Sequence, residues 1–306
     1  MDLLAIGTIA LDQIFEVDRL PQYHHEGVIQ CSGTYYGGRA PNVAAMAAKL
    51  GVSTGIVSPV GDDFVSSGYE EHLSRLGVDL RGVARVPGQK TKQILIFTDT
   101  SGQQIAFFQF GAECGFKNME VPTCLIQESK IVHISSGDYR FNVECAELAH
   151  RYDVLVSFDV GNDPFTEIAE YLDGMIRHTT LLFMNDVELA SVLDRLGLEQ
   201  VSDLLEYGPT AIVVISKQDR SSCVITRASI EHIGSAMSDV RDPTGASDGY
   251  VAGFLAAYAR GNDLRSAGTF GASELSFIVE SIGCQTNLPD WHQLLKRRRR
   301  LFNLSR

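Results

Sequence analysis

The stretch RDPTGASDGYVAGFLAAYARG, residues 241–261, begins with turn-forming residues and continues as an apolar helix. The first turn of this helix is expected near residues 245–248. The first backbone N–H groups of a helix have no partner within it and can bind an anion, and here they belong to Gly245, Ala246, Ser247 and Asp248. Asp248 would then lie beside a bound phosphoryl group. The alternative is that Asp248 or Ser247 only caps the helix.

The composition excludes several classes of protein. The chain has 306 residues, 44% of them apolar, and a net charge of -12, which argues against a nucleic-acid partner. A basic run at 294–302 is interpreted as a solvated helix face or a frayed terminus. Neither a leader sequence nor a membrane-spanning stretch is evident, so we expect a cytoplasmic protein that binds no membrane. Scattered cysteines indicate reduced thiols and no zinc site.

Short apolar runs recur along the chain, as expected for strands that are covered on both faces of a sheet. They are residues 3–7, 54–61, 130–136, 154–159, 180–185 and 211–216. Stretches with helical period lie between them. This alternation predicts an α/β fold with a doubly wound, mostly parallel sheet sandwiched by helices.

Two segments, residues 12–36 and 81–110, interrupt this rhythm with alternating polar and apolar residues, turn glycines and no helical period. TDTSGQQ at 98–104 is typical of a turn between two strands. We expect both segments to form a small antiparallel sheet that projects from a single domain over residues 1–306. This sheet would serve as a lid or pair with another subunit. Its aromatic residues could cover a ligand or pack the sheet: Phe15, Tyr35, Tyr36, Phe107, Phe108 and Phe110.

Several common motifs are missing from the sequence. No stretch matches the phosphate loop GxxxxGK[ST], and no GxGxxG opens a helix after the first apolar run. A GxSxG elbow is also missing, since ISSG at 134–137 does not match it. These absences argue against a P-loop enzyme, a nicotinamide dehydrogenase and an α/β hydrolase.

Three motifs, in their order and spacing, resemble those of the ribokinase or PfkB-type carbohydrate kinases. GGRAPNVAAMAAKLG at 37–51 resembles the first signature of the family, NDVE at 185–188 its N-x-x-E motif, and DPTGASDGYVAGF at 242–254 its second signature. The resemblance extends from residue 5 to residue 289. It implies a ribokinase-like fold with a β lid, and transfer of the γ-phosphoryl group of ATP to a hydroxyl with the help of Mg²⁺.

The resemblance also implies roles for the residues at the start of the helix. Asp248 would be the catalytic base, and Gly245, Ala246 and Ser247 would supply the anion hole. Ser247 stands where the family usually has a second glycine, and its side chain could narrow the approach. The positive end of the helix favours the carboxylate form, which predicts that Asp248 is a weak base. Phosphoryl transfer tolerates a weak base because its transition state is loose.

The acceptor would be bound by residues of the first strand and the first signature. The family places an acceptor-binding aspartate where Asp12 stands, although an acid after a strand also suits a turn. A carboxylate can accept hydrogen bonds from two sugar hydroxyls. Gly37 and Gly38 would let the acceptor approach the backbone, and Asn42 could bind hydroxyls. Arg39 is expected either near a phosphate or as a charge that faces solvent.

The nucleotide would be bound by residues of two later segments. Asn185 and Glu188 have the spacing of a capping box. By the resemblance they would also organise water on Mg²⁺, which Glu188 would contact through water. The segment ISKQDRSSCVIT at 215–226 resembles the strands that flank the adenine pocket of the family. Its candidates for nucleotide contact are Ser216, Lys217 and Gln218, and a plain surface hairpin is the alternative.

The secondary motifs HISSGD, SFDVGND and GCQTNLP are most similar to the archaeal branch of nucleoside kinases and related sugar kinases. We therefore expect a kinase that uses ATP and Mg²⁺ to phosphorylate a hydroxyl of a nucleoside or sugar, and that could form a homodimer through the lid. The alternative suggested by Ser247 is a non-catalytic sugar- or nucleoside-binding protein on the same fold. A dinucleotide oxidoreductase is a third possibility, against which the missing fingerprint argues.

Overall fold

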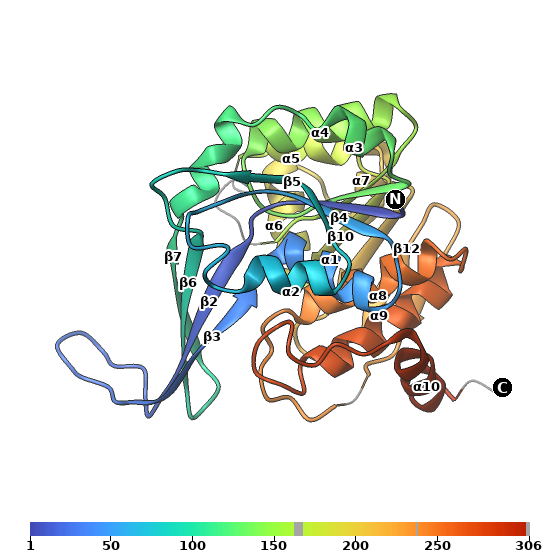
Figure 1. The fold of residues 1–306 in the computed structure, drawn as a ribbon. Helices are drawn as coiled ribbons and strands as arrows, with labels where there is room; N and C mark the ends of the chain where they lie inside the picture. Colours follow the sequence, from blue (N-terminus) through green and yellow to red (C-terminus); the bar gives the residue numbers. More distant parts are fainter. Residues whose placement is uncertain (162–167, 237, 304–306) are drawn as a thin grey trace.

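A computed structural model describes residues 1–161, 168–236 and 238–303 of the chain (Figure 1). The last two residues of the motif SFDVGND, at positions 162 and 163, lie outside the described residues. The remaining sequence motifs lie within them. Their placement can therefore be compared with the sequence predictions.

The larger sheet has nine strands in the order β13-β12-β11-β10-β9-β8-β1-β4-β5. Pairing is parallel from β11 to β5 and antiparallel at the β11–β12 and β12–β13 pairs. The six apolar runs all form parallel strands, which confirms the predicted doubly wound sheet. The strands are β1 (Leu3–Ile6), β4 (Thr54–Val60), β5 (Asp79–Arg85), β8 (Ile131–Ile134), β9 (Leu155–Asp159), β10 (Leu181–Asn185), β11 (Ala211–Ile215), β12 (Ser222–Ile225) and β13 (Ile230–Ile233).

Helices cover both faces of the larger sheet (Figure 1). One face packs against α1 (Arg39–Lys49), α8 (Ala246–Tyr258), α9 (Leu264–Ile278) and α10 (Trp291–Leu301), with α2 (Tyr69–Arg75) near β4 and β5. The other face packs against α3 (Thr123–Gln127), α4 (Tyr139–Arg151), α5 (Ala169–Arg177), α6 (Asp186–Leu196) and α7 (Val201–Tyr207). A 3-10 helix, η1 (Gly111–Asn118), precedes α3.

The small sheet projects from the carboxyl-end side of the larger one, at the lower left of Figure 1. Its strands are β2 (Ala10–Val17), β3 (Ile29–Gly37), β6 (Lys92–Asp99) and β7 (Gln104–Gln109), in the order β3-β2-β6-β7. β2 pairs antiparallel with β3, and β6 pairs antiparallel with β7 through the predicted turn. The central pair, β2 and β6, is parallel, which the long connection between them through β3, α1, β4, α2 and β5 permits.

The predicted start of the second small-sheet segment, residue 81, needs correction. Residues 79–85 form β5, which pairs in parallel with β4 at the edge of the larger sheet. The small sheet resumes only at Lys92. An edge strand is half-exposed and therefore has the same alternation of polar and apolar residues as a strand of a projecting sheet, which explains the misassignment.

Helix α8 is buried nearly all round, between α1 and α9. Ten of its residues, from Asp248 to Ala257, are buried, and its apolar side chains pack into the core that covers β10 and β11. A helix embedded in this way has little freedom to tilt or slide. The start of α8 is therefore a fixed point on which a site can be built.

The basic run near the end of the chain is partly packed against the protein. Arg297 makes two contacts with the Glu280 carboxylate, at 2.8 and 3.0 Å, and Arg298 donates to Thr269 Oγ1 at 2.6 Å. Within the described residues, no helix has both the length and the apolar character needed to span a membrane.

Candidate active site

Gly245 lets the chain enter α8 through a tight turn. It has φ 79° and ψ 7°, in the left-handed region that favours glycine. A Cβ at this position would lie 2.7 Å from Cys284 Sγ. The turn is held by Asp242, whose carboxylate accepts from the N–H of Thr244 at 2.9 Å and of Gly283 at 2.9 Å. The loop before α8 and the loop after α9 are thus joined into one unit.

The start of α8 keeps backbone donors available. Ala246 N–H donates to Pro243 O at 3.2 Å. In the described part of the chain, no atom accepts from the N–H groups of Gly245, Ser247 or Asp248, and no side chain caps the helix. The capping role considered for Asp248 and Ser247 is therefore wrong. Of the four N–H groups predicted to bind an anion, three are therefore available, because that of Ala246 donates within the turn. Ser247 is exposed at the start of the helix.

Asp248 is buried, with 3% of its surface exposed, and its Oδ2 accepts from Asn42 Nδ2 at 2.7 Å. Burial raises the pKa of Asp248 to about 7, although Arg39 and the Asn42 hydrogen bond lower it, and the charges of Asp159 and Glu188 raise it further. The prediction of a weak base is therefore wrong. Loss of water around the carboxylate outweighs the favourable position at the helix start.

Asp12 lies within strand β2, so the turn role considered for it is also wrong. It is close enough to Asp248 for the charge of that residue to raise its pKa. Its side chain rests against Gly37, where any Cβ would overlap with the carboxyl group. Burial raises the pKa of Asp12 to about 7, with further contributions from Asp248 and Asp242 and an opposing one from Lys92. Among the described residues, its Oδ1 has no hydrogen-bond partner. This oxygen is suited to a ligand hydroxyl.

Arg39 begins α1 and forms an ion pair with Asp159. Its Nη2 lies 2.8 Å from Asp159 Oδ2 and donates to the Asp159 carbonyl at 2.8 Å, while 24% of its side chain is exposed. Arg39 therefore does not simply face solvent. It adds positive charge near Asp248. Gly38 precedes α1 with φ 96° and links Gly37 of the small sheet to this helix.

The predicted capping box at the start of α6 is confirmed. Glu188 N–H donates to Asn185 Oδ1 at 2.9 Å, and Asn185 N–H donates to Glu188 Oε2 at 2.8 Å. Glu188 is 8% exposed, and burial together with the charge of Asp159 raises its pKa. The described residues include no group of three His, Cys, Asp or Glu side chains that could hold a metal. Asp159 and Glu188 nevertheless suit Mg²⁺, which usually takes one or two carboxylates together with water and substrate phosphates.

Ser216, Lys217 and Gln218 lie in the turn between β11 and β12, which pair antiparallel. Ser216 N–H donates to Ser221 O at 2.8 Å, and Lys217 N–H lies 3.3 Å from Asp186 Oδ1. The turn therefore lies beside the start of α6. Its contact with a nucleotide stays a prediction.

Sequence reasoning missed two buried residues of this region, Asp159 and Gln285. Asp159 ends β9 next to β10 and pairs with Arg39. Gln285 Nε2 donates to Asn42 Oδ1 at 2.8 Å. Asp159 lies in the motif SFDVGND and Gln285 in GCQTNLP. In the sequence analysis these motifs were used only for their similarity to the archaeal nucleoside kinases and related sugar kinases. An acid at the carboxyl end of a buried strand was a usable signal for Asp159.

The described residues line cavities at the small sheet and at the start of α4. One of about 360 Å³ is lined by Ile14 and Thr98 of the small sheet and by Arg241, Asp242 and Ile282 of the joined loops. This cavity therefore lies between the small sheet and the loop before α8. None of the residues predicted to bind the acceptor lines this cavity, although Asp12 lies two residues before Ile14 on β2.

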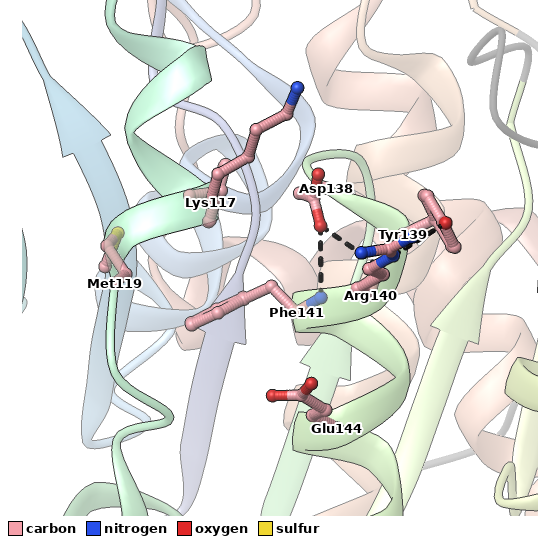
Figure 2. Close-up of a pocket in the computed structure, with 8 residues that line it drawn as sticks. Lys117, Met119, Asp138, Tyr139, Arg140, Phe141 and Glu144 are labelled. Atoms are coloured by element: carbon pink, nitrogen blue, oxygen red, sulfur yellow. Dashed lines mark hydrogen bonds between the residues drawn. The ribbon is translucent and has the colours of Figure 1, made fainter.

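The second cavity, of about 500 Å³, lies between η1 and the start of α4 (Figure 2). Phe116, Met119 and Phe141 provide its apolar lining, and Lys117 and Glu144 lie at its edge. The carboxylate of Asp138 accepts from the N–H groups of Arg140 and Phe141, at 3.0 and 3.2 Å, and so caps α4. None of the predicted site residues lines this cavity.

Comparison with known proteins gives a consistent result. The model of the pfkB family carbohydrate kinases matches residues 1–291. The chain is 39% identical over 296 residues to the nucleoside kinase of Methanocaldococcus jannaschii, covering 96% of both chains, and 36% identical to that of Methanothermobacter thermautotrophicus, covering 97% and 95%.

Solved structures share the fold. The crystal structure of the M. jannaschii nucleoside kinase superposes with a TM-score of 0.91, at 38% identity and 98% coverage of each chain. A Burkholderia thailandensis nucleoside kinase in complex with inosine superposes with a TM-score of 0.87 over 99% and 98% of the two chains. At 21% identity, the latter shows the likeness of the fold alone.

Substitution of Gly245 tests the geometry of the helix tip. Gly245→Ala would force a Cβ against Cys284 and displace the free amides, so we expect phosphoryl transfer, measured as ADP formation, to fall about 100-fold. The matched control is Gly261→Ala. Gly261 has a similar φ of +83°, with no atom near its added Cβ, and should show only a modest loss of thermal stability. Equal activity in both variants would contradict the assignment.

Proposed function

The chain belongs to the pfkB family of carbohydrate kinases and is an ATP-dependent kinase that phosphorylates a hydroxyl, and we propose that its acceptor is a nucleoside and its base is Asp248. The observation that carries this proposal is the pair of buried carboxylates, Asp12 and Asp248, that face one region from the small sheet and from α8. The names of the two archaeal relatives support the choice of a nucleoside.

In the proposed reaction, Asp12 accepts hydrogen bonds from two hydroxyls of the ribose through its unpartnered Oδ1 and its neighbouring oxygen. Gly37 has no Cβ and so leaves room for the Asp12 carboxyl to lie against the backbone, where it can meet the sugar. Asp248 accepts a hydrogen bond from the hydroxyl that is phosphorylated. This arrangement fixes both ends of the ribose relative to the start of α8.

The transfer step forms a bond between the acceptor oxygen and the γ-phosphorus while the bond from that phosphorus to the β-phosphate oxygen breaks. The hydroxyl proton passes to Asp248, and ADP leaves. The free N–H groups of Gly245, Ser247 and Asp248 bind the negative oxygens of the transferred group. With its pKa near 7, Asp248 is a better proton acceptor than an ordinary aspartate.

Nucleotide binding would involve the residues on the other side of the transfer point. Asp159 and Glu188 would hold Mg²⁺, Glu188 through water, and Asn185 would keep the Glu188 carboxylate in place. Bound Mg²⁺ neutralises charge that develops on the phosphates. We assign Ser216, Lys217 and Gln218 to the edge of the adenine site, because their turn lies next to the start of α6.

The small sheet would act as a lid that excludes water from the acceptor. The rival proposal of a non-catalytic binding protein depended on Ser247. Since the N–H of Ser247 remains free and its side chain is exposed, the substitution leaves the backbone donor intact. The helix tip therefore retains what a kinase needs there.

The lid also offers a surface for a second copy of the chain. Phe15 and Phe97 stack at 4.7 Å, and Phe107 packs edge-on against Phe97 at 6.2 Å. Phe107 is nevertheless 59% exposed. An exposed aromatic cluster on a sheet is typical of an interaction surface. We propose that this face of the lid forms a homodimer.

The role of Asp248 is tested with Asp248→Asn. We expect kcat to fall about 10³-fold, because the amide cannot accept the proton. In the wild type, kcat/KM should rise with pH and level off above about 7, where Asp248 of the free enzyme is ionised. Near-normal turnover in a folded variant would exclude Asp248 as the base.

The same variant should also unfold at a higher temperature than the wild type at pH 8. The pKa of Asp248 is raised in the folded protein, so ionisation of this carboxyl lowers the stability of the wild type as the pH rises from about 4 to about 7. The amide that replaces it does not ionise and escapes this loss. Thermal unfolding followed by circular dichroism at pH 5 and pH 8 measures the difference, and a gap that does not widen with pH would contradict the raised pKa.

A panel of acceptors tests the substrate class. ADP formation should be fastest with nucleosides, and free ribose and fructose 6-phosphate should react at least about tenfold more slowly, because they lack the base that binds under the lid. Asp12→Asn should raise the KM for the nucleoside more than the KM for ATP. A preference for a free sugar would contradict the nucleoside proposal and leave the kinase assignment intact.

The dimer is tested with a matched pair of lid variants. Light scattering of the wild type should give twice the 33.5 kDa mass of one chain. Phe107→Glu should produce monomers. The neighbouring Phe108, which lies on the opposite face above Lys92, is 54% exposed, and Phe108→Glu should leave the dimer intact. A monomeric wild type, or the reverse order of effects, would exclude this surface.

A further inference from the structure

A chain of buried hydrogen bonds leads from the small sheet to Asp248. Tyr69 OH donates to Gly37 O at 2.9 Å, and Gln285 Nε2 donates to Tyr69 OH at 2.7 Å. The same nitrogen donates to Asn42 Oδ1 at 2.8 Å, and Asn42 Nδ2 donates to Asp248 Oδ2 at 2.7 Å. Five separate parts of the fold, namely β3, α2, the loop after α9, α1 and α8, meet in this chain.

The direction of these hydrogen bonds is fixed by the group at which they begin. The carbonyl oxygen of Gly37 can only accept, so the hydroxyl of Tyr69 must donate to it. A lone pair of Tyr69 is then left to accept, which requires the NH₂ group of Gln285 to point toward it. That NH₂ group also meets Asn42, so the oxygen of Asn42 must face Gln285. The NH₂ group of Asn42 is consequently directed at Asp248.

The other end of Gln285 is fixed independently. Its Oε1 lies 2.9 Å from His72 Nε2, which must donate because the amide oxygen can only accept. His72 is held in place by Tyr36, whose ring stacks on it at 4.6 Å. Burial lowers the pKa of His72, so the ring is neutral near pH 7 and carries its proton on Nε2. A flipped Gln285 would therefore lose its hydrogen bonds at both ends.

The two orientations of the Asn42 amide have nearly the same shape and opposite chemical effects. In the observed one, an NH₂ group stabilises the carboxylate of Asp248. In the reverse one, an amide oxygen would face a carboxylate oxygen and repel it. In the described part of the chain, no side-chain donor contacts the other oxygen of Asp248, Oδ1. Correct orientation of Asn42 thus leaves Oδ1 for the acceptor.

We propose that Gln285 is a positioning residue for phosphoryl transfer, which fixes the orientation of the Asn42 amide and thereby holds Asp248 toward the acceptor hydroxyl. The effect on turnover rests on the proposed function of Asp248 as the base. Gln285 itself touches neither reactant in this arrangement. It acts through Asn42, and its hydrogen bond to Tyr69 also helps to hold the Gly37 backbone, which lies against Asp12, in place.

Two substitutions of Gln285 separate orientation from packing. Gln285→Glu keeps the size of the side chain but replaces its donor with an acceptor, which favours the reversed Asn42 amide. Gln285→Met keeps the volume and makes no hydrogen bond. We expect kcat to fall about tenfold in Gln285→Met and further in Gln285→Glu, with little change in the KM for ATP. A role in packing alone predicts the opposite order, because glutamate is the closer match in shape.

The matched control lies two residues away in the same loop. Asn287 Nδ2 donates to Phe277 O at 2.7 Å and takes no part in the chain of hydrogen bonds. Asn287→Ala should therefore disturb the loop and keep kcat within about twofold of the wild type, since it removes one hydrogen bond outside the site. A comparable loss of kcat in this control would show that any disturbance of the loop is sufficient, and would overturn the proposal.

A second readout does not depend on activity. The ¹H–¹⁵N signals of the Asn42 side chain can be identified by their loss in Asn42→Asp. They should move in Gln285→Glu and remain in place in Asn287→Ala. Unchanged signals in folded Gln285→Glu, or moved signals with wild-type kcat, would overturn the proposal. Full activity of Asp248→Asn would instead refute the base assignment, and the Asn42 signals would still report whether Gln285 sets its orientation.

Discussion

The arrangement depends on a carboxylate that is buried at the start of a helix. Two effects act on Asp248 in opposite directions: the positive end of α8 favours its charge, and the loss of water disfavours it. With 3% exposure, burial prevails and raises the pKa of Asp248 to about 7. The same residue can then be ionised at neutral pH and still accept a proton. The fold maintains this balance by holding α8 firmly between α1 and α9.

A second buried acid extends the same principle to the acceptor. Asp12 on β2 has a pKa of about 7, and the charges of Asp12 and Asp248 raise one another's energy. Arg39 and Lys92 supply opposing charge from α1 and β6. Lys92 is itself paired with Glu113 at 2.9 Å. An apo site of this kind costs stability, and binding of ligand hydroxyls and of a metal would relieve the cost.

Much of the fold could be predicted from the sequence because its signals are local. The six apolar runs became parallel strands, and Gly245 marked the start of α8 within one residue. The misassigned strand β5 shows the limit, because an exposed edge of the larger sheet has the same residue pattern as a projecting strand. The pairing partner of such a strand is decided by contacts distant in sequence.

The candidate site could be predicted only in part. The positions of Asp12, Asn42 and Asp248 follow from motifs. In the structure Asn42 donates to Asp248, and the charge of Asp248 raises the pKa of Asp12. The pKa of Asp248 could not be predicted, since it depends on the burial of α8 between α1 and α9 and on charges from β9 and α6 at once. Gln285 escaped notice because its importance lies in the direction of hydrogen bonds to Tyr69 and Asn42, each more than 200 residues away.

The most direct measurement of the central claim is the titration of the Asp248 carboxyl carbon by ¹³C NMR in the ligand-free protein. The signal can be identified by its loss in Asp248→Asn. We expect Asp248 to titrate with a pKa of about 7. A pKa near that of an ordinary aspartate, or below it, would mean that the helix start, and not burial, controls this carboxylate, and would contradict the proposed mechanism.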